Sequence, residues 1–392
     1  MNSSGDGDRG EAEALVQAAR ALGATIRAHR DETERLRRTP PALVKALAEA
    51  GLFKLWLPRA LGGVEADPET FVRVVEEVSA ADGATGWNVS IGAGYSVIAG
   101  YLREPVAREI FSDPYAVVAG QIGPQGKAIA TSGGYRVRGR WSFGSGIHHS
   151  TWVVSGCSVF DGDTQRVNSK GVAHRLLMMT PVSEVRIDDN WHVSGLRGTG
   201  SCDYALEDVF VPEERAFLLF GKSQQPGPLY ALPTALYSYP IAAVPLGIAR
   251  TAIDALVEIA ASKHPSGATA PLRELATAQI AVARADTMLR AARARLFETI
   301  DDLWQTACAG REVTPLQRAN VRAASVYTAE QCAGAVDLVW KASGATSIQE
   351  SSVIERCFRD IHAATQHFAV NERLLEDAGR VLFGLEPKSP VF

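Results

Sequence analysis

The sequence predicts a mainly α protein with a central β domain between two helical units. Apolar residues recur at helical spacing through most of the segment before Tyr115. From Tyr115 to about Leu219 the chain is instead rich in β-branched residues, glycines and short turns, and long helical patterns return after Pro245. We therefore expect a flexible tail over residues 1–10, a helical domain over 11–114, a β domain over 115–225 and a second helical domain over 226–392.

The first helical unit is predicted from four stretches. Apolar spacing indicates a helix from Glu11 to His29. Thr39 caps a second helix, whose first turn tolerates two prolines. A third is expected over Asp67–Ala81, and the stretch from Ala84 to about Leu102 is apolar enough to be buried.

The central unit reads as a series of short strands with no helices between them, a pattern typical of an antiparallel barrel or sandwich. The expected strands are Ala116–Gln121, Ala128–Thr131, Tyr135–Phe143, Trp152–Phe160, Leu176–Pro181, Glu184–Ile187 and Tyr204–Val211.

The last unit is predicted to be a four-helix bundle that also buries surface against other subunits. Its apolar positions recur at close to seven-residue spacing, as in packed helices. The expected helices are Pro245–Lys263, Pro271–Ala309, Pro315–Ala342 and Ser351–Phe383.

Composition narrows the class of protein. The 392 residues are 46% hydrophobic and 21% charged, with a net charge of −4, which argues against nucleic-acid binding. Five scattered cysteines without a CxxC pair indicate free thiols in a reducing compartment and no metal site. The polar, acidic N-terminus is not a signal peptide, and no apolar run approaches the ~18 residues of a membrane span. We expect a soluble cytoplasmic protein.

Residues 133–146, GGYRVRGRWSFGSG, form the most informative stretch. Two glycines make a hairpin turn, and the strand then alternates, with Trp141 and Phe143 on one face. If this alternation continues, Ser145 points to the same side. An aromatic platform with one hydroxyl suits a flat heteroaromatic ligand, whereas the alternative is a core strand ending in a turn.

Two other stretches carry candidate chemistry. WHVSGLRGTGS, residues 191–201, is glycine-rich, but a strand and not a helix follows it, which argues against a dinucleotide or phosphate loop. It is either a ligand loop or a tight strand crossing. In RDIHAATQHFAV, residues 359–370, His367 has small neighbours on a predicted helix, so it is either a general acid or base or a structural histidine. His362 is interpreted as structural, and of His148 and His149 at most one can face the site of Ser145.

Together these motifs resemble the acyl-CoA dehydrogenase superfold over essentially the whole chain after the tail. The resemblance rests on PPALVKALAEAGLFKLWLPRALGG, on WSFGSG, on GLRGTGSCDYALEDVFVPEER and on ERCFRD. It implies an N-terminal helical domain, a middle β-barrel and a C-terminal four-helix bundle. It also implies a homotetramer with a flavin between barrel and bundle.

One departure separates this chain from many dehydrogenases of that fold. Where they carry a Tyr-Glu-Gly motif, this sequence has His367 and Phe368, and Phe368 cannot abstract a proton. Some relatives place the glutamate on another helix. A histidine here with Ser145 in W-x-F-x-S-G resembles the two-component flavin-dependent monooxygenases, such as the hydroxyphenylacetate and steroid-phenol hydroxylases and dibenzothiophene monooxygenase.

Carried over residue by residue, the resemblance implies the following roles. His367 and Ser145 are catalytic, with Ser145 near the flavin N5 edge. The flavin-binding residues are Trp141, Phe143, Ser145, Trp191, Arg197, Ser201 and, from a partner subunit, Lys263. The substrate side consists of Trp87, Tyr95 and Gln121.

The implied reaction uses reduced FMN or FAD from a separate NAD(P)H:flavin reductase, together with O₂, through a C4a-hydroperoxide. A histidine titrating near neutrality would deprotonate a phenolic substrate. The alternatives are an acyl-CoA dehydrogenase-like or nitroalkane-oxidase-like flavoenzyme, and a relative that binds a ligand without turnover.

Overall fold

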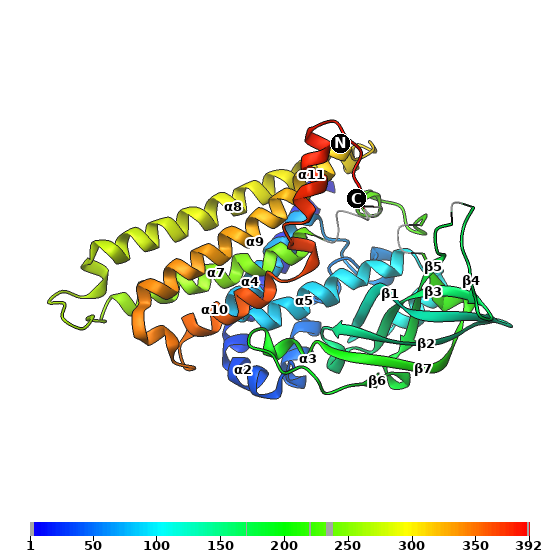
Figure 1. The fold of residues 1–392 in the computed structure, drawn as a ribbon, viewed down its shortest axis with the longest axis horizontal. Coiled ribbons are helices and arrows are strands. Elements are labelled where there is room, and N and C mark those ends of the chain that lie inside the picture. The colour runs from blue at the N-terminus through cyan, green and yellow to red at the C-terminus, as the bar shows by residue number, and fades with distance from the viewer. Residues whose placement is uncertain (1–3, 170, 219–220, 233–237, 390–391) are drawn as a thin grey trace.

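Long helices occupy one side of the molecule and a β-sheet the other, with α5 (Gly83–Tyr95) extending toward the sheet (Figure 1). The computed structural model describes residues 4–169, 171–218, 221–232, 238–389 and 392. Residues 4–10, predicted as part of a tail, belong to a helix, and residues 1–3 lie outside the described residues. The predicted domain boundaries stay predictions.

Two of the N-terminal helices, α4 (Pro68–Ala81) and α5, begin at an aspartate that caps the helix. Asp67 and Asp82 each accept a backbone N–H at 2.8 Å, from Thr70 and Thr85, and so begin α4 and α5. The helix predicted over Glu11–His29 is divided in two. The helices before α5 are α1 (Ser4–Ala21), α2 (Gly23–Leu36), α3 (Pro41–Glu49) and α4 (Pro68–Ala81), and α6 (Glu104–Phe111) follows it.

The small residues of α5 let this helix approach α4 closely. A Cβ on Gly86 would lie 1.9 Å from the hydroxyl of Ser79, so glycine is required there. Because α5 is buried along most of its length, its side chains reach the interior from a fixed backbone.

The sheet is open and mixed, so the predicted antiparallel barrel or sandwich is wrong. Its order is β6-β7-β2-β1-β3-β5-β8, with β4 beside β3, and both end strands have two residues. After the β1–β2 hairpin the chain returns to the other side of β1, where β3 pairs in parallel. The strands are β1 (Val118–Thr131), β2 (Gly134–Gly144), β3 (Trp152–Asp161), β4 (Thr164–Gln165), β5 (Arg175–Pro181), β6 (Arg186–Ile187), β7 (Cys202–Pro212) and β8 (Ala216–Phe217).

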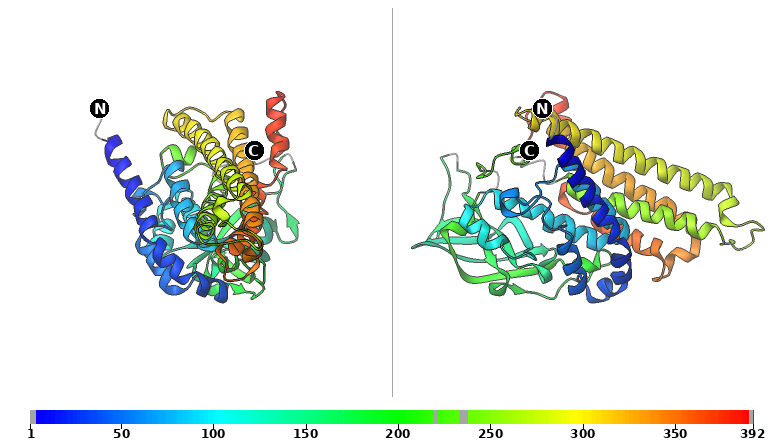
Figure 2. Two further views of the ribbon diagram at one scale, coloured as in Figure 1. Left: turned by 90° about the vertical axis from the view of Figure 1, so that its left-hand side faces the viewer. Right: turned by 180° about the vertical axis from the view of Figure 1, so that it is seen from behind.

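The long C-terminal helices α7, α8 and α9 run side by side (Figure 1 and Figure 2), and α9 packs against α7, α8, α10 and α11. The helix predicted to start at Pro245 starts earlier and contains that proline. The helix predicted over Ser351–Phe383 is broken into two. The helices are α7 (Tyr239–Ala260), α8 (Ala276–Cys308), α9 (Pro315–Ser343), α10 (Val353–Ala364) and α11 (Leu374–Leu382).

Helix α7 is long and apolar enough to cross a membrane by length and composition alone, which the sequence prediction did not anticipate. However, 72% of its most apolar window is buried inside the molecule, against α4, α9 and α10. Its hydrophobicity is therefore accounted for by core packing.

Two large hydrophobic cores, and a small third cluster around Phe392, are formed by the residues that the structure describes. One joins helices from both ends of the chain, and the other fills the sheet around Trp141 and Tyr204. The predicted functional segments meet along the boundary between these cores.

Candidate active site

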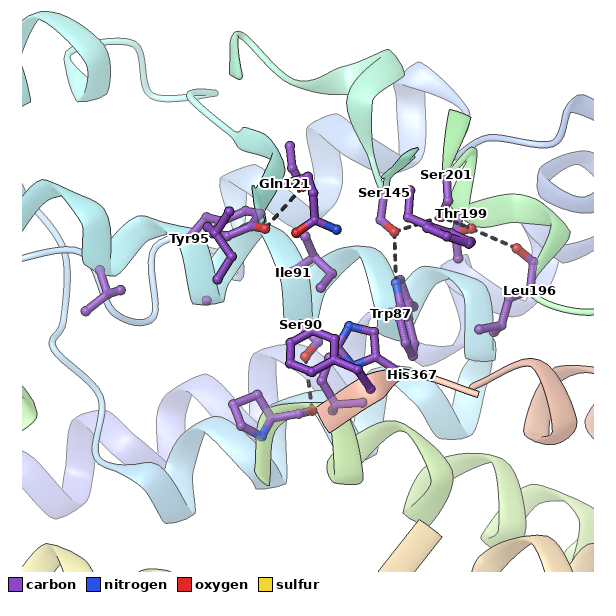
Figure 3. A pocket seen from close by; sticks show the side chains of 18 of the residues that line it. Trp87, Ser90, Ile91, Tyr95, Gln121, Ser145, Leu196, Thr199, Ser201 and His367 are labelled. Atoms are coloured by element: carbon purple, nitrogen blue, oxygen red, sulfur yellow. Dashed lines mark hydrogen bonds between the residues drawn. The ribbon is translucent and has the colours of Figure 1, made fainter. Parts of the chain in front are cut away.

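A cavity of about 410 Å³ lies where α5, β1, the end of β2, the 191–201 loop, the start of α7 and residues 363–368 meet (Figure 3). Its volume falls in the range of small-molecule sites, roughly 300–1,000 Å³. Its walls are mainly apolar, and among the described residues that line it there is no Lys, Arg, Asp or Glu. The predicted site residues that line it are Trp87, Tyr95, Gln121, Phe143, Ser145, Trp191, Ser201 and His367, whereas Trp141, Arg197 and Lys263 do not.

One wall comes from α5. Trp87 and Tyr95 lie on the same helix and both face the cavity. The Tyr95 hydroxyl donates to the carbonyl of Gly120 at 3.1 Å, and burial raises its pKa above the ordinary value. This phenol is therefore a fixed, neutral part of the wall.

At the end of β2, Trp141 and Phe143 face different surroundings, although the alternation of the strand predicted that they share one face. The register against β7 shifts between Trp141 and Gly144, and Phe143 takes a left-handed φ of +66°. Trp141, which precedes this shift, stays on the buried face of the strand, stacked on Tyr204 with its N–H donated to the Gly156 carbonyl at 2.9 Å. Phe143 is 63% exposed and lines the cavity. Trp141 lies on the buried face of β2 with Tyr135 and Val137 and does not line the cavity, and its predicted contact with a cofactor stays a prediction.

Three hydroxyl groups form a continuous chain at the cavity wall, drawn in Figure 3. Ser145 lies 2.7 Å from Ser201, which lies 2.7 Å from Thr199. The indole N–H of Trp87 donates to Ser145 at 3.1 Å, and Thr199 donates to the carbonyl of Leu196 at 2.9 Å. We call Ser145, Ser201 and Thr199 the hydroxyl chain.

The 191–201 loop is held from the helical side. Asp360 on α10 accepts the backbone N–H of Leu196 at 2.6 Å, and Trp191 donates its indole N–H to the Leu196 carbonyl at 3.3 Å. Arg197 points away, 3.6 Å from the carboxylate of Glu34, and does not line the cavity. Of the two alternatives for this loop, the structure shows both: a tight crossing that also faces a cavity.

The sequence predicted that His367 lies on a continuous helix. In the structure it lies just beyond the end of α10. Its Nδ1 accepts the backbone N–H of Ala369 at 3.2 Å, capping a short 3₁₀ turn. The neutral imidazole therefore carries its proton on Nε2. Burial lowers the pKa of His367 to about 4, below the range near neutrality that the sequence analysis expected.

Lys263 lies beyond the end of α7 opposite to the cavity, where its ammonium group contacts the Ser343 carbonyl and, at 2.6 Å, the Thr346 hydroxyl. Its predicted role belongs to a partner subunit, and stays a prediction. Neither His148 nor His149 lines the cavity.

Sequence reasoning missed two aromatic residues on the inner wall, Trp56 and Tyr101. The Trp56 indole nitrogen and the Tyr101 hydroxyl are buried without a hydrogen-bond partner among the described residues. In the sequence each of these residues is an aromatic residue within or next to an apolar stretch. Such a pattern indicates a residue of the hydrophobic core and does not by itself point to a cavity.

Comparisons with known proteins agree with this architecture. Residues 9–105 match the acyl-CoA dehydrogenase N-terminal domain and residues 239–372 the acyl-CoA dehydrogenase C-terminal domain. An indole-3-acetate monooxygenase from Pseudomonas putida is 32% identical over 93% of this chain and 92% of its own. The oxygenase subunit HsaA of a flavin-dependent monooxygenase from Rhodococcus jostii is 32% identical over 94% of this chain and 98% of its own.

Among solved structures, XiaF from Streptomyces in complex with FADH₂ and glycerol superposes with a TM-score of 0.89 at 26% identity, covering 98% of each chain. These similarities confirm the resemblance that the motifs suggested.

Proposed function

The chain belongs to the acyl-CoA dehydrogenase family, within its flavin-dependent monooxygenase branch, and on this premise we propose that it is the oxygenase component of a two-component system. It takes reduced flavin from a separate NAD(P)H:flavin reductase and uses O₂ to oxygenate a small aromatic substrate. The relatives from Pseudomonas and Rhodococcus, named as a monooxygenase and an oxygenase subunit, support this reaction class.

One observation carries the proposal: no carboxylate lines the cavity among the described residues. A dehydrogenase or nitroalkane oxidase needs a base to remove a proton from carbon, and Phe368 stands next to His367 where such a base is expected. Oxygenation needs instead an apolar pocket that excludes water. The dehydrogenase-like and oxidase-like alternatives are thus less well supported.

The lining residues fit a flavin ring. Phe143 and Trp191 stand edge to face, 6.1 Å apart, and offer aromatic surface to a flat ring. Ser145 and Ser201 supply polar contacts beside them. When bound, reduced flavin supplies the electrons that activate O₂, while these residues bind, orient and shield it.

His367 acts as a hydrogen-bond donor and not as a base. With Nδ1 occupied by the Ala369 N–H, its Nε2 proton is the group available to a substrate oxygen. Because its pKa is about 4, the ring stays neutral at pH 7 and does not add a buried charge. A hydrogen bond to a phenolic or carbonyl oxygen orients the aromatic ring for attack.

The remaining features are proposed at a finer level. The flavin is FMN or FAD, the protein is cytoplasmic, and α7–α10 form a four-helix bundle in a homotetramer, with Lys263 of one copy binding the flavin phosphate in another. Exposed apolar side chains support association of copies, including Ile280, Leu316, Leu382 and Phe383.

The uncharged cavity favours an uncharged substrate. A carboxylate buried without a cationic partner is costly, so an aromatic acid is a poorer substrate than the matching neutral compound. The Pseudomonas relative is named for an aromatic acid, so this expected substrate preference differs from what that name alone suggests.

The test supplies the protein with a flavin reductase, NADH, flavin and matched compounds: 3-methylindole against indole-3-acetate, and 4-methylphenol against 4-hydroxyphenylacetate. Oxygenated product is scored by mass. We expect the neutral member of each pair to react at least about tenfold faster. Absence of product, together with bleaching of bound oxidised FAD by an acyl thioester without a reductase, favours the dehydrogenase-like alternative.

A further inference from the structure

We propose that Gly94 on α5 sets the depth of the cavity, and that the substrate is an elongated, uncharged aromatic molecule of two or more rings. The inference deepens the proposed function and rests on it: the oxygenated ring lies near His367, and the rest of the molecule extends past Gly94. It comes from comparing the surroundings of the glycines in α5.

Two of these glycines are required by close packing, and Gly94 is not. A Cβ added at Gly86 would lie 1.9 Å from the hydroxyl of Ser79, and one added at Gly92 would lie 2.8 Å from the ring of Phe53. Beyond its own helix and chain neighbours, a Cβ added at Gly94 would have one described atom within 4 Å, Cζ3 of Trp56 at 3.8 Å. That distance is an ordinary van der Waals contact, so packing leaves room for a side chain here.

Backbone conformation does not require a glycine at this position either. The φ of Gly94 is not in the left-handed region, and glycine weakens a helix relative to alanine because of its greater freedom in the unfolded chain. Gly94 and the fully buried Trp56 both line the cavity. The space that a side chain at position 94 would fill is therefore cavity space, and the glycine keeps it open.

Gly94 lies well away from the end of the cavity that holds His367. At that end Trp87 contacts His367 and donates its indole N–H to Ser145 at 3.1 Å. Gly94 follows Trp87 by seven residues on α5, which is about 10 Å along the helix axis. Figure 3 shows Trp87, Ile91 and Tyr95 following one another along this helix, away from Ser145.

The cavity continues past Gly94 between apolar and aromatic side chains. Val97, Ile98 and Tyr101 follow it in the chain, and all three are buried and line the cavity. The total volume of about 410 Å³ is well above the roughly 150 Å³ that hold one benzene ring. A second ring placed here buries apolar surface, which favours binding in proportion to the area removed from water.

The second ring and the flavin do not compete for the same space. Phe143 and Trp191, which are proposed to face the flavin ring, line the cavity beside Ser145. Gly94 and Trp56 lie toward the other end, along α5. The reacting ring is therefore held between the flavin and the inner part of the cavity that Gly94 keeps open.

The test compares 4-phenylphenol, which has two linked rings, with 4-methylphenol, which has one, in the presence of a flavin reductase, NADH and flavin. Wild type is expected to have a kcat/KM at least about tenfold higher for 4-phenylphenol. Gly94→Leu should lower that value by at least about tenfold and the value for 4-methylphenol by less than about threefold. Gly94→Ala adds less volume and should lower the preference by roughly threefold.

A second measurement needs no turnover. Because Trp56 and Trp87 line the cavity, quenching of tryptophan fluorescence gives the dissociation constants of both phenols. The ratio of these constants should change in the Gly94 variants in the same direction as the ratio of kcat/KM values. This measurement carries the test for any variant that folds and does not turn over.

Gly379→Leu on α11 is the matched control, because a Cβ added there meets no described atom within 4 Å and Gly379 does not line the cavity. It should leave the preference within about twofold of wild type. An unchanged preference in both Gly94 variants, or an equal change in Gly379→Leu, overturns the inference. If wild type oxygenates both phenols equally well, the inference fails and the monooxygenase proposal stands. If 4-phenylphenol binds more weakly to Gly94→Leu but neither phenol is oxygenated by wild type, the proposed function fails and the role of Gly94 stands; if neither phenol binds or reacts, both proposals fail.

Discussion

The imidazole of His367 meets the indole of Trp87 edge to face, with ring centroids 5.5 Å apart and planes at 73°. One ring comes from a helix near the start of the chain and the other from a turn near its end. Both rings line the cavity, and their contact holds the His367 imidazole at its wall.

Replacing His367 tests whether this proton matters. His367→Ala should lower product formation by roughly 100-fold, since the substrate loses its positioning hydrogen bond, whereas His367→Gln should retain part of the activity. Flavin affinity should change by less than about threefold in both. Product per reduced flavin consumed is the measurement. Unchanged turnover in His367→Ala would instead favour a non-catalytic role for this residue.

Trp141 and Phe143 form a matched pair that separates core from cavity. Trp141→Ala should destabilise the protein by about 3–5 kcal/mol, because it empties a fully buried site. Phe143→Ala should leave the free energy of unfolding within about 0.5 kcal/mol while weakening flavin binding. Chemical denaturation and flavin titration distinguish the two, and the opposite assignment of effects would contradict the bulge at Phe143.

Buried histidine gives a defined pH dependence. Burial lowers the pKa of His149 to about 4, and both ring nitrogens lack a partner among the described residues. In the unfolded chain the pKa is about 6.5, so the unfolded state binds more protons between these values and stability falls as pH decreases through this window. The melting temperature of His149→Phe relative to wild type should therefore rise as pH falls from about 6.5 to about 4. A constant difference would contradict this account.

The pH dependence of His149 must be measured as a difference between His149→Phe and wild type, because Asp360 changes the stability with pH in the opposite direction. Burial and the nearby Asp82 carboxylate raise the pKa of Asp360 to about 7, so its native state binds more protons in the same pH range and this group's contribution to stability falls as pH rises.

Asp360 also offers a test of the loop anchor. Asp360→Asn keeps an acceptor for the Leu196 N–H and should preserve stability at pH 8. Asp360→Leu leaves that buried N–H unpaired and should cost about 1–3 kcal/mol. Equal stability of the two variants in urea would show that the hydrogen bond does not hold the loop.

Motifs with local signals were predictable from the sequence. Ser145 and His367 were found through the residues around them, and Trp87 through its apolar helix, and all three line one cavity. The order of helical, β and helical segments followed from composition.

Features that depend on partners far away in the chain were not predictable. The bulge that turns Phe143 away from the buried face of Trp141 arises from the register of β2 against β7. The hydroxyl chain needs the Leu196 carbonyl, whose position depends on Asp360, 164 residues later. No local sequence pattern indicated that β1 pairs in parallel with β3, or that α10 ends before His367.

The most direct test of the central claim is turnover under isotopically labelled O₂, with a flavin reductase, NADH, flavin and an uncharged aromatic substrate. The account predicts a product that carries one labelled oxygen atom, with no product when the reductase or this protein is omitted. A product without label, or substrate oxidation by bound oxidised flavin in the absence of a reductase, would contradict it.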